Sequence, residues 1–191
     1  VELAQVAEQL GDLGGAISAL SDVLLLDPTD RAVMRSLERL FARTERANDL
    51  AGILAMQIGL AQNPGESGEM RLRLAEVRRT SLGDPVGAAQ MLQQAAADAP
   101  GNAKLLPALE AVYADLSMRS GPEAGAARSV VASLLEPRYE AGGDAQKLVG
   151  VLESRLETVT GGADRKALWR RIAGLREGPL RNADLAFAAL G

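Results

Sequence analysis

A repeat of 36 residues constrains the fold of this chain more than any other feature of its sequence. Pro28, Pro64 and Pro100 follow one another at that interval, and each closes a segment in which apolar residues recur every three to four positions. Between the prolines, a small or polar residue followed by aspartate marks a turn, at Gly11-Asp12, Asn48-Asp49 and Gly83-Asp84. Because such pairs end one helix and cap the next, each unit is predicted to be a helix, a tight turn, a second helix and a proline-containing loop.

The composition favours helices along the whole chain. Alanine and leucine, both strong helix formers, are the commonest residues, whereas aromatic residues make up only 3% of the sequence. Apolar side chains such as Leu3, Val6 and Leu10 have the spacing of a stripe on one face of a helix. We therefore expect an all-α protein.

The repeat continues after the third proline in a diverged form. A shift of 98 residues aligns 70–92 with 168–190 without a gap, and Arg73 and Arg171 are among the identical pairs. Residues 101–128 do not follow the period. The sequence thus predicts three regular helical pairs in 1–100, an irregular helical junction in 101–128, and two further pairs in 129–191, the last of them truncated.

The layout of 119–141 is left open by the sequence, between one long helix and two shorter ones. Ser120 and Glu123 have the spacing of a capping box, which predicts a helix start at Ser120. Proline in a helix interior costs roughly 3 kcal/mol and bends or ends the helix. We therefore expect a kink or a break near 134–137, just before Pro137.

The repeat resembles the tetratricopeptide repeat (TPR). The first unit has the family's small and large residues at matching spacings, namely Leu3, Ala4, Gly11, Asp12, Ala16, Leu20, Val23 and Pro28. The third unit has, with one extra residue before its turn, Leu74, Ala75, Gly83, Asp84, Ala88, Leu92, Ala95 and Pro100. The second unit is a weaker match. The resemblance implies a right-handed superhelical solenoid of antiparallel helix pairs, with about 10–12 helices in this chain.

The same resemblance implies a function and a surface. TPR arrays bind other proteins or peptides, and first-helix residues that face away from the second helix line their concave surface. The corresponding positions here are Gln5, Glu8, Gln9, Glu38, Ala42, Glu45, Glu76 and Arg79. These mostly polar residues suit recognition of an extended peptide, and they are equally typical of any solvated concave surface.

The residue types that are missing exclude most enzyme chemistry. The chain has no cysteine and no histidine, so it has no thiolate nucleophile, no disulfide, no imidazole acid–base catalyst and no cysteine- or histidine-ligated metal. The carboxylate pairs Glu136/Glu140 and Glu153/Glu157 have helical spacing, which is typical of a solvated helix face. We expect no catalytic, cofactor-binding or metal-binding residues, and no enzymatic activity.

Charge and hydropathy narrow the range of partners. The net charge is −4, and aromatic residues do not interleave with the arginines, so we expect no nucleic-acid binding. The fully apolar runs, such as Val23–Leu26, are too short for direct membrane insertion.

The charges are distributed unevenly along the chain. Residues 163–191 contain six basic and three acidic residues, a net charge of +3, which leaves −7 for the rest. A candidate basic patch is therefore Arg165, Arg170, Arg171 and Arg176. One interpretation is an arginine-rich solvated surface, and the other is a site for an acidic peptide or for the acidic half of another copy.

Helical periodicity reaches both ends of the sequence, where Val1, Leu3 and Val6, and Phe187 and Leu190, lack an obvious cover. We expect either further repeats of a longer protein or self-association through open solenoid ends. The leading hypothesis is a protein–protein interaction scaffold, and the alternative is a structural subunit whose solenoid packs in a large complex. The alanine- and arginine-rich composition suggests a bacterial source, and both the cytoplasm and the periplasm remain open.

Overall fold

The computed structural model describes residues 2–178, except for the side chain of Leu3. In this part of the chain there are ten α-helices and no strand. The expected all-α class and the expected number of helices are thereby confirmed. Val1, Phe187 and Leu190, three of the residues for which open ends were predicted, lie outside the described residues, as does the side chain of Leu3.

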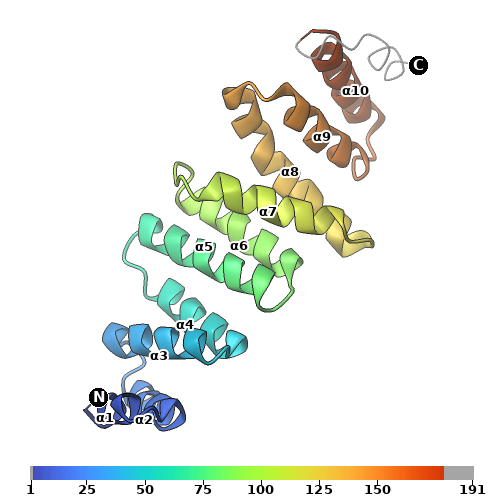
Figure 1. The fold of residues 1–191 in the computed structure, drawn as a ribbon. Helices are drawn as coiled ribbons and strands as arrows, with labels where there is room; N and C mark the ends of the chain where they lie inside the picture. The colour runs from blue at the N-terminus through green and yellow to red at the C-terminus, as the bar shows by residue number, and fades with distance from the viewer. Residues whose placement is uncertain (1, 179–191) are drawn as a thin grey trace. The chain divides into compact units, whose positions relative to one another are not determined.

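The chain divides into two compact units, Val1–Pro100 and Gly101–Gly191. Helices of the first unit are α1 (Glu2–Gln9), α2 (Leu13–Leu26), α3 (Arg31–Arg43), α4 (Ala47–Gly59), α5 (Pro64–Thr80) and α6 (Pro85–Asp98). Those described in the second unit are α7 (Leu105–Ser117), α8 (Pro122–Gly142), α9 (Ala145–Leu156) and α10 (Gly162–Glu177) (Figure 1).

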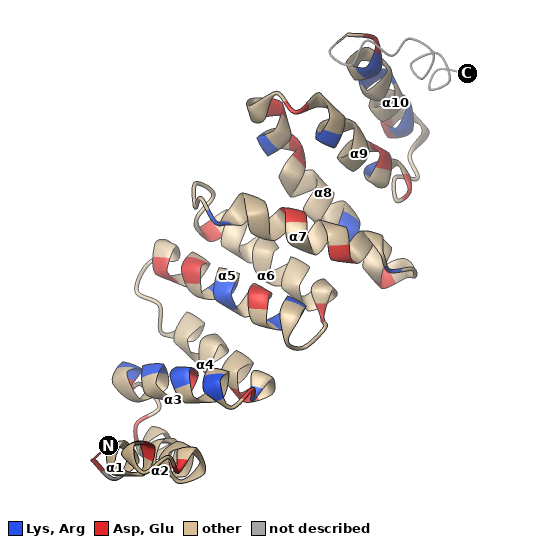
Figure 2. Ribbon diagram, in the orientation of Figure 1, with Lys and Arg blue, Asp and Glu red and all other residues tan. Residues whose placement is uncertain are grey.

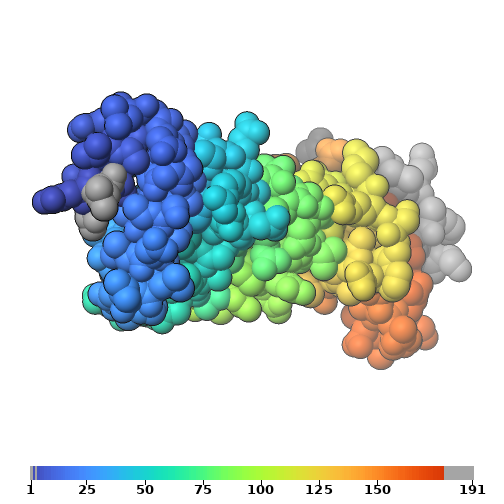
Figure 3. Space-filling model, turned by 90° about the horizontal axis from the view of Figure 1, so that it is seen from below, coloured from blue at the N-terminus to red at the C-terminus, as the bar shows by residue number. Residues whose placement is uncertain are grey.

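The first unit consists of three antiparallel helix pairs, α1/α2, α3/α4 and α5/α6. Each helix packs against the next one along the chain, so the pairs follow one another in sequence order. The space-filling view shows the same succession, from dark blue for the first pair to green for the third (Figure 3). This arrangement of helix, tight turn, helix and loop is a TPR-like helical-repeat fold.

The turns inside the pairs show why the helices begin and end where they do. Asp12 and Asp84 each accept a hydrogen bond of 2.8 Å from a backbone N–H of the following helix, as N-capping residues do. The residues just before them, Gly11 and Gly83, have positive φ angles of 79° and 61°, which glycine adopts without strain. Both turns were predicted from these residue pairs.

The turn of the second pair differs from the prediction. It lies at 44–46, and Asn48-Asp49 belong to the first turn of α4, whose N-cap position is held by Arg46 without a capping side-chain bond. Glu45 takes the positive φ, 55°, that glycine has in the other turns. The sequence pattern failed here because the left-handed position contains neither glycine nor asparagine.

The core of the first unit is a continuous row of apolar side chains from successive helices. Met34, Leu40 and Leu92 are completely buried, and so are the small residues Ala16 and Ala88 at the helix crossings. Gly52, the residue at the matching position of α4, is exposed instead. The second pair is therefore covered less completely than its neighbours.

The second unit has its own apolar core, built by α7 to α10. Leu109, Leu135, Leu152 and Ile172, one from each helix, are completely buried. Residues 101–128, in which the sequence period fails, contain α7 and the first third of α8. The predicted capping box is wrong, because the N-cap residue of α8 is Gly121, with φ 110° and no capping side-chain bond.

The second unit also resolves the alternatives left open around Pro137. α8 runs without interruption from Pro122 to Gly142, with Pro137 inside it, so the expected break is absent. The guanidinium of Arg138 donates a hydrogen bond of 2.5 Å to the carbonyl oxygen of Leu134, close to the proline. Buried residues on both sides of Pro137, Leu135 and Tyr139, keep the two halves of the helix in one core.

None of the helices in residues 2–178 is both long and apolar enough to cross a membrane.

Candidate functional site

Three helices of the first unit, α1, α3 and α5, are the first helices of their pairs, and we call the surface that they form the helix-A face. Charged side chains connect these helices. Glu8 on α1 accepts from Arg39 and from Arg43 on α3, each at 2.9 Å, and Glu38 on α3 pairs with Arg73 on α5. The helix-A face is thus crossed by ion pairs between successive repeats.

Glu38 is placed deepest in this face. It is only 8% exposed, and the side-chain amide of Gln57 on α4 donates a hydrogen bond of 3.1 Å to its second carboxylate oxygen. A buried carboxylate is tolerated when its oxygens are paired in this way. The sequence placed Glu38 at a partner-binding surface, whereas its carboxylate is engaged by Gln57 of its own repeat and by Arg73 of the next one.

The remaining residues predicted for partner binding fall into three groups. Gln5, Gln9 and Ala42 are exposed on α1 and α3. Glu76 and Arg79 pair with each other on α5 at 2.9 Å. Glu45 lies in the turn after α3 rather than on the helix-A face. Among the predicted residues, Glu8 and Glu38 therefore link helices, and only the exposed ones remain candidates for direct contact.

A row of four arginines runs along α3, and we call Arg31, Arg35, Arg39 and Arg43 the α3 arginine row. Their spacing of four residues places them on one face of the helix, as the blue bands of α3 in Figure 2 show. Arg31 pairs with Glu66 at 2.5 Å, and Arg39 and Arg43 share the carboxylate of Glu8. Arg35 is exposed and has no hydrogen-bond or ion-pair partner within residues 2–178.

The positive charge of the row is only partly neutralised. Its four guanidinium groups, together with Arg73, face the three carboxylates of Glu8, Glu38 and Glu66, so two positive charges are in excess. That excess stands out in a unit whose residues 1–30 contain no lysine or arginine. The excess is centred on Arg35, in the middle of the row.

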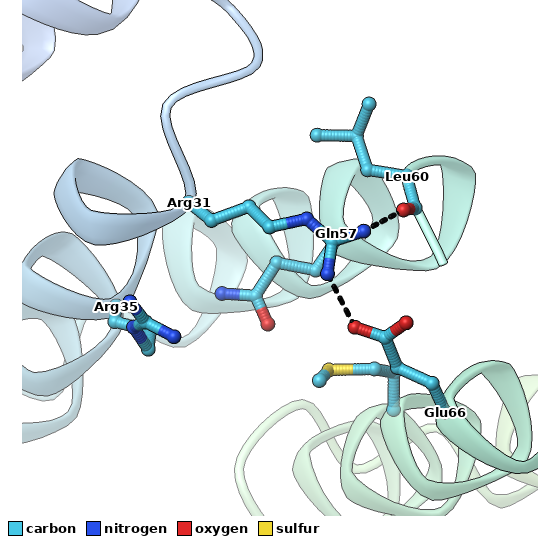
Figure 4. A pocket seen from close by; sticks show the side chains of 6 residues that line it. Arg31, Arg35, Gln57, Leu60 and Glu66 are labelled. Atoms are coloured by element: carbon cyan, nitrogen blue, oxygen red, sulfur yellow. Dashed lines mark hydrogen bonds and ion pairs between the residues drawn. The ribbon is translucent and has the colours of Figure 1, made fainter. Parts of the chain in front are cut away.

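Arg35 borders a small pocket between α3, α4 and α5 (Figure 4). The pocket has a volume of about 50 Å³ and is lined by Arg31, Arg35, Gln57, Leu60, Glu66 and Met70. On one side Arg31 holds the wall together, because its guanidinium contacts both the Glu66 carboxylate and the Leu60 carbonyl oxygen. The pocket thus combines an unpaired guanidinium with an apolar edge formed by Leu60 and Met70.

The Glu66 carboxylate at this pocket is stabilised in its ionised form. The backbone N–H of Gln62 donates to it at 2.8 Å, and this bond, assisted by Arg31, lowers the pKa of the carboxyl from its ordinary value. The negative charge of Glu66 is therefore permanent at neutral pH, but it is directed at Arg31 and leaves Arg35 uncompensated.

Sequence reasoning missed the α3 arginine row, although a signal was present. Four arginines at intervals of four residues within 31–43 are visible without a structure. The family pattern marks other polar positions, and the overall charge distribution marks the C-terminal end, so neither points to a one-sided row of like charges on one helix.

The predicted basic patch on α10 is mostly engaged in internal bonds. Arg171 pairs with Glu136 and Glu140 of α8, and Arg176 pairs with Glu153 of α9. Arg165 donates to the carbonyl oxygen of Leu156 at 2.8 Å, at the end of α9, where a cation is favourable. Arg170 is exposed and has no partner within the described part of the chain.

A second polar cluster lies in the second unit. The Glu110 carboxylate accepts from the ammonium of Lys147 at 2.9 Å and from the hydroxyl of Tyr139 at 3.0 Å. The Lys147 bond lowers the pKa of the Glu110 carboxyl, and burial, reinforced by Glu110, raises the pKa of the Tyr139 hydroxyl. Each polar group has a partner, so the cluster joins α7, α8 and α9 and is suited to a structural role.

An apolar groove between α2 and α4 is the other notable surface of the first unit. Its floor contains Leu37, Phe41 and Ile53, which are buried. At its rim Leu25 is 80% exposed and Met56 is 38% exposed. Exposed apolar side chains that gather around a groove are typical of a contact surface.

Within residues 2–178 there is no group of three or more aspartate or glutamate side chains placed to hold a metal ion.

Comparisons with known proteins give similarity at the level of shape. No family model and no curated protein matches the chain. Among solved structures, MamA is 19% identical over 100% of this chain and 91% of its own, with a TM-score of 0.43. A kinesin light chain protein of Podosopora anserina with nearly identical TPR-like repeats is 18% identical over 99% of this chain and 90% of its own, with a TM-score of 0.37.

Proposed function

We propose that this chain is a non-enzymatic scaffold that binds other proteins through the helix-A face of its first unit. The observation that carries the proposal is the α3 arginine row, in which Arg35 is exposed and unpaired while the surrounding charges are paired between helices. Like charges four residues apart on a helix destabilise it slightly. A guanidinium that no described group compensates, in a row whose other three members are paired, is therefore better explained by a partner than by stability.

The composition supports the non-enzymatic part of the proposal. A chain without histidine or cysteine lacks the side chains that most often act as general bases and nucleophiles. Glu66 in the pocket wall and Glu38, which accepts from the wall residue Gln57, are each bound to an arginine.

Site-specific photo-crosslinking tests the proposed face. A photo-reactive amino acid at Ala42, exposed next to the arginine row, is expected to crosslink to a partner in a lysate of the source organism. The matched control is Ala55, an exposed alanine of α4. Crosslinks at Ala55 but none at Ala42 would refute the helix-A face as the docking surface.

A second candidate function, assembly as a structural subunit, is favoured by the apolar groove between α2 and α4. In that case a second copy of this chain would cover Leu25 and Met56, and Leu25→Lys would lower self-association. Light scattering over a concentration series measures this directly. A chain that stays monomeric at all concentrations would exclude the self-assembly version.

A further inference from the structure

The α3 arginine row has a definite spacing, and the spacing limits which ligands fit it. Four residues of α-helix rise by about 6 Å, so neighbouring guanidinium stems of the row are separated by that distance. In an extended peptide, alternate side chains point to the same side and are roughly 6.6 Å apart. Acidic residues at every second position of an extended segment therefore match the row, within the reach of the flexible arginine side chains.

We infer that the α3 arginine row binds an extended acidic segment of a partner protein, with acidic residues at alternate positions and one carboxylate seated on Arg35. This inference deepens the proposed function and depends on it. The row faces two carboxylates of its own, Glu8 and Glu66, and both are already paired with the flanking arginines. Arg35 is the one member of the row whose charge no described group neutralises.

The pocket beside Arg35 gives the bound carboxylate a defined place. With a volume of about 50 Å³, the pocket has room for a carboxyl group. In its wall the Glu66 carboxylate is bonded to Arg31 and the Gln57 amide to Glu38, so Arg35 supplies the unpaired donors. The apolar edge of Leu60 and Met70 excludes part of the surrounding water. A guanidinium–carboxylate bond gains strength in such a partly enclosed position.

Simple attraction of negative charge would not depend on how the acidic residues are spaced in the peptide, whereas the proposed binding mode does. A peptide with the same number of acidic residues in an unsuitable pattern can contact only part of the row. Binding should therefore depend on the pattern as well as on the charge, and on Arg35 more than on an arginine elsewhere.

The test uses two peptides of identical composition, both acetylated and amidated. One alternates its acidic residues, Glu-Thr-Glu-Thr-Glu-Thr-Glu, and the other has none two positions apart, Glu-Glu-Thr-Thr-Thr-Glu-Glu. Binding to the whole chain is measured by fluorescence anisotropy at low and at physiological salt. The alternating peptide should bind at least about tenfold more tightly, and Arg35→Gln should remove about tenfold of that affinity.

Matched variants keep the result interpretable. Arg170→Gln removes the same charge from another exposed, unpaired arginine and should leave the affinity within about twofold. Arg35→Lys should retain part of the affinity, because it keeps the charge but loses the two-pronged contact. Circular dichroism should show that all variants are folded, since Arg35 makes no bond that holds the unit together.

Several outcomes would overturn the inference. They are equal binding of the two peptides, an equal loss from Arg35→Gln and Arg170→Gln, or no binding of either peptide. A single-stranded oligonucleotide of the same charge that binds more tightly and depends on Arg35 would reassign the row to nucleic acid. If the mismatched peptide binds once its C-terminus is a free carboxylate instead of an amide, the row would be assigned to C-terminal carboxylates of partner chains. If Ala42 crosslinks to a partner although neither peptide binds, the proposed function holds and this inference is wrong.

Discussion

Glu38 is the only charged residue among the buried residues of 2–178, and its position decides what it does. Its two carboxylate oxygens are taken up by Arg73 of the next repeat and by Gln57 of its own repeat. A residue that appears in the sequence as part of a polar binding face is thus a link between neighbouring helix pairs. The difference arises because the side chain is buried against Gln57 of α4 and Arg73 of α5 instead of pointing into solvent.

Replacing Glu38 should therefore affect stability. Glu38→Ala leaves the amide of Gln57 and the guanidinium of Arg73 without their acceptor, and it should lower the free energy of unfolding by about 2 kcal/mol. Urea denaturation followed by circular dichroism measures the change. The control is Glu76→Ala, which removes an exposed pair within α5 and should cost less than about 0.5 kcal/mol. Equal effects of the two changes would contradict the linking role.

Glu45 has an unfavourable backbone conformation. Its φ of 55° lies in the left-handed region, where a side chain costs roughly 1–2 kcal/mol and glycine costs little. The corresponding turns at Gly11, Gly83 and Gly143 use glycine. The position after α3 therefore requires a backbone shape that its residue does not favour.

Glycine at this position should stabilise the first unit. We expect Glu45→Gly to raise the free energy of unfolding by about 1 kcal/mol, because relief of the left-handed strain outweighs the greater freedom of the unfolded chain. Ala55→Gly, in the middle of α4, should lower it by about 1 kcal/mol. The same urea experiment measures both, and a loss of stability in Glu45→Gly would show that the turn tolerates the side chain without strain.

At the scale of the helices, side chains of opposite charge that lie about one repeat apart in the sequence form ion pairs between alternate helices. The two members of each pair are 35 residues apart, close to the repeat length of 36. The pairs in the first unit are Glu8 with Arg43, Arg31 with Glu66, and Glu38 with Arg73. In the second unit Glu136 and Arg171 have the same separation. A search of the sequence for opposite charges at this interval finds these residues as candidate pairs once the period is known, and the structure shows that the pairs form.

The long helix α8 offers a test at the same scale. Pro137 has no N–H to donate to the carbonyl of Ser133, and an interior proline costs a helix up to roughly 3 kcal/mol. Pro137→Ala should therefore raise the thermal midpoint of the second unit. The matched change is Pro122→Ala at the first turn of α8, where proline is well tolerated, and it should alter the midpoint little. A lower midpoint in Pro137→Ala would mean that packing of α8 depends on the proline.

For the whole molecule, the carboxylates set the response to acid. Three of the carboxyls have a pKa below the ordinary value, and in each case a hydrogen bond is the largest cause. The donors are Gln62 for Glu66, Ser67 for Asp98 and Lys147 for Glu110. A carboxyl with a lower pKa in the folded state binds fewer protons there than when unfolded. Its contribution to stability is therefore present above the ordinary values, 4.5 for glutamate and 3.8 for aspartate, and is lost as the pH falls below them.

The expected result is a flat stability between pH 6 and 8 and a decline below about pH 4.5. The flat part follows from the absence of histidine, the side chain that ordinarily titrates in that range. Urea midpoints measured from pH 8 to pH 3 check both parts. Asp98→Asn should reduce the steepness of the decline, and a chain whose midpoint is unchanged at pH 3 would show that these carboxylates do not stabilise the fold.

The sequence by itself determined the class of fold and most of the helix ends. Prolines at a fixed interval, aspartate caps and left-handed glycines act over a few residues, so their effects can be read along the chain without knowing what lies nearby. Predictions from local sequence were wrong at two places. At Glu45 the residue does not favour the backbone conformation that it adopts, and at Pro137 buried neighbours keep the helix continuous.

Only the tertiary structure decided which polar residues are occupied and which are free. Four residues that looked available for a partner are each bonded to another helix, namely Glu8, Glu38, Arg171 and Arg176. Arg35, which no family position marked, is unpaired among the described residues. The physical reason is that pairing between repeats depends on the axial offset of one helix against the next. Side-chain packing sets this offset, and a shift of one residue changes which carboxylate meets which guanidinium.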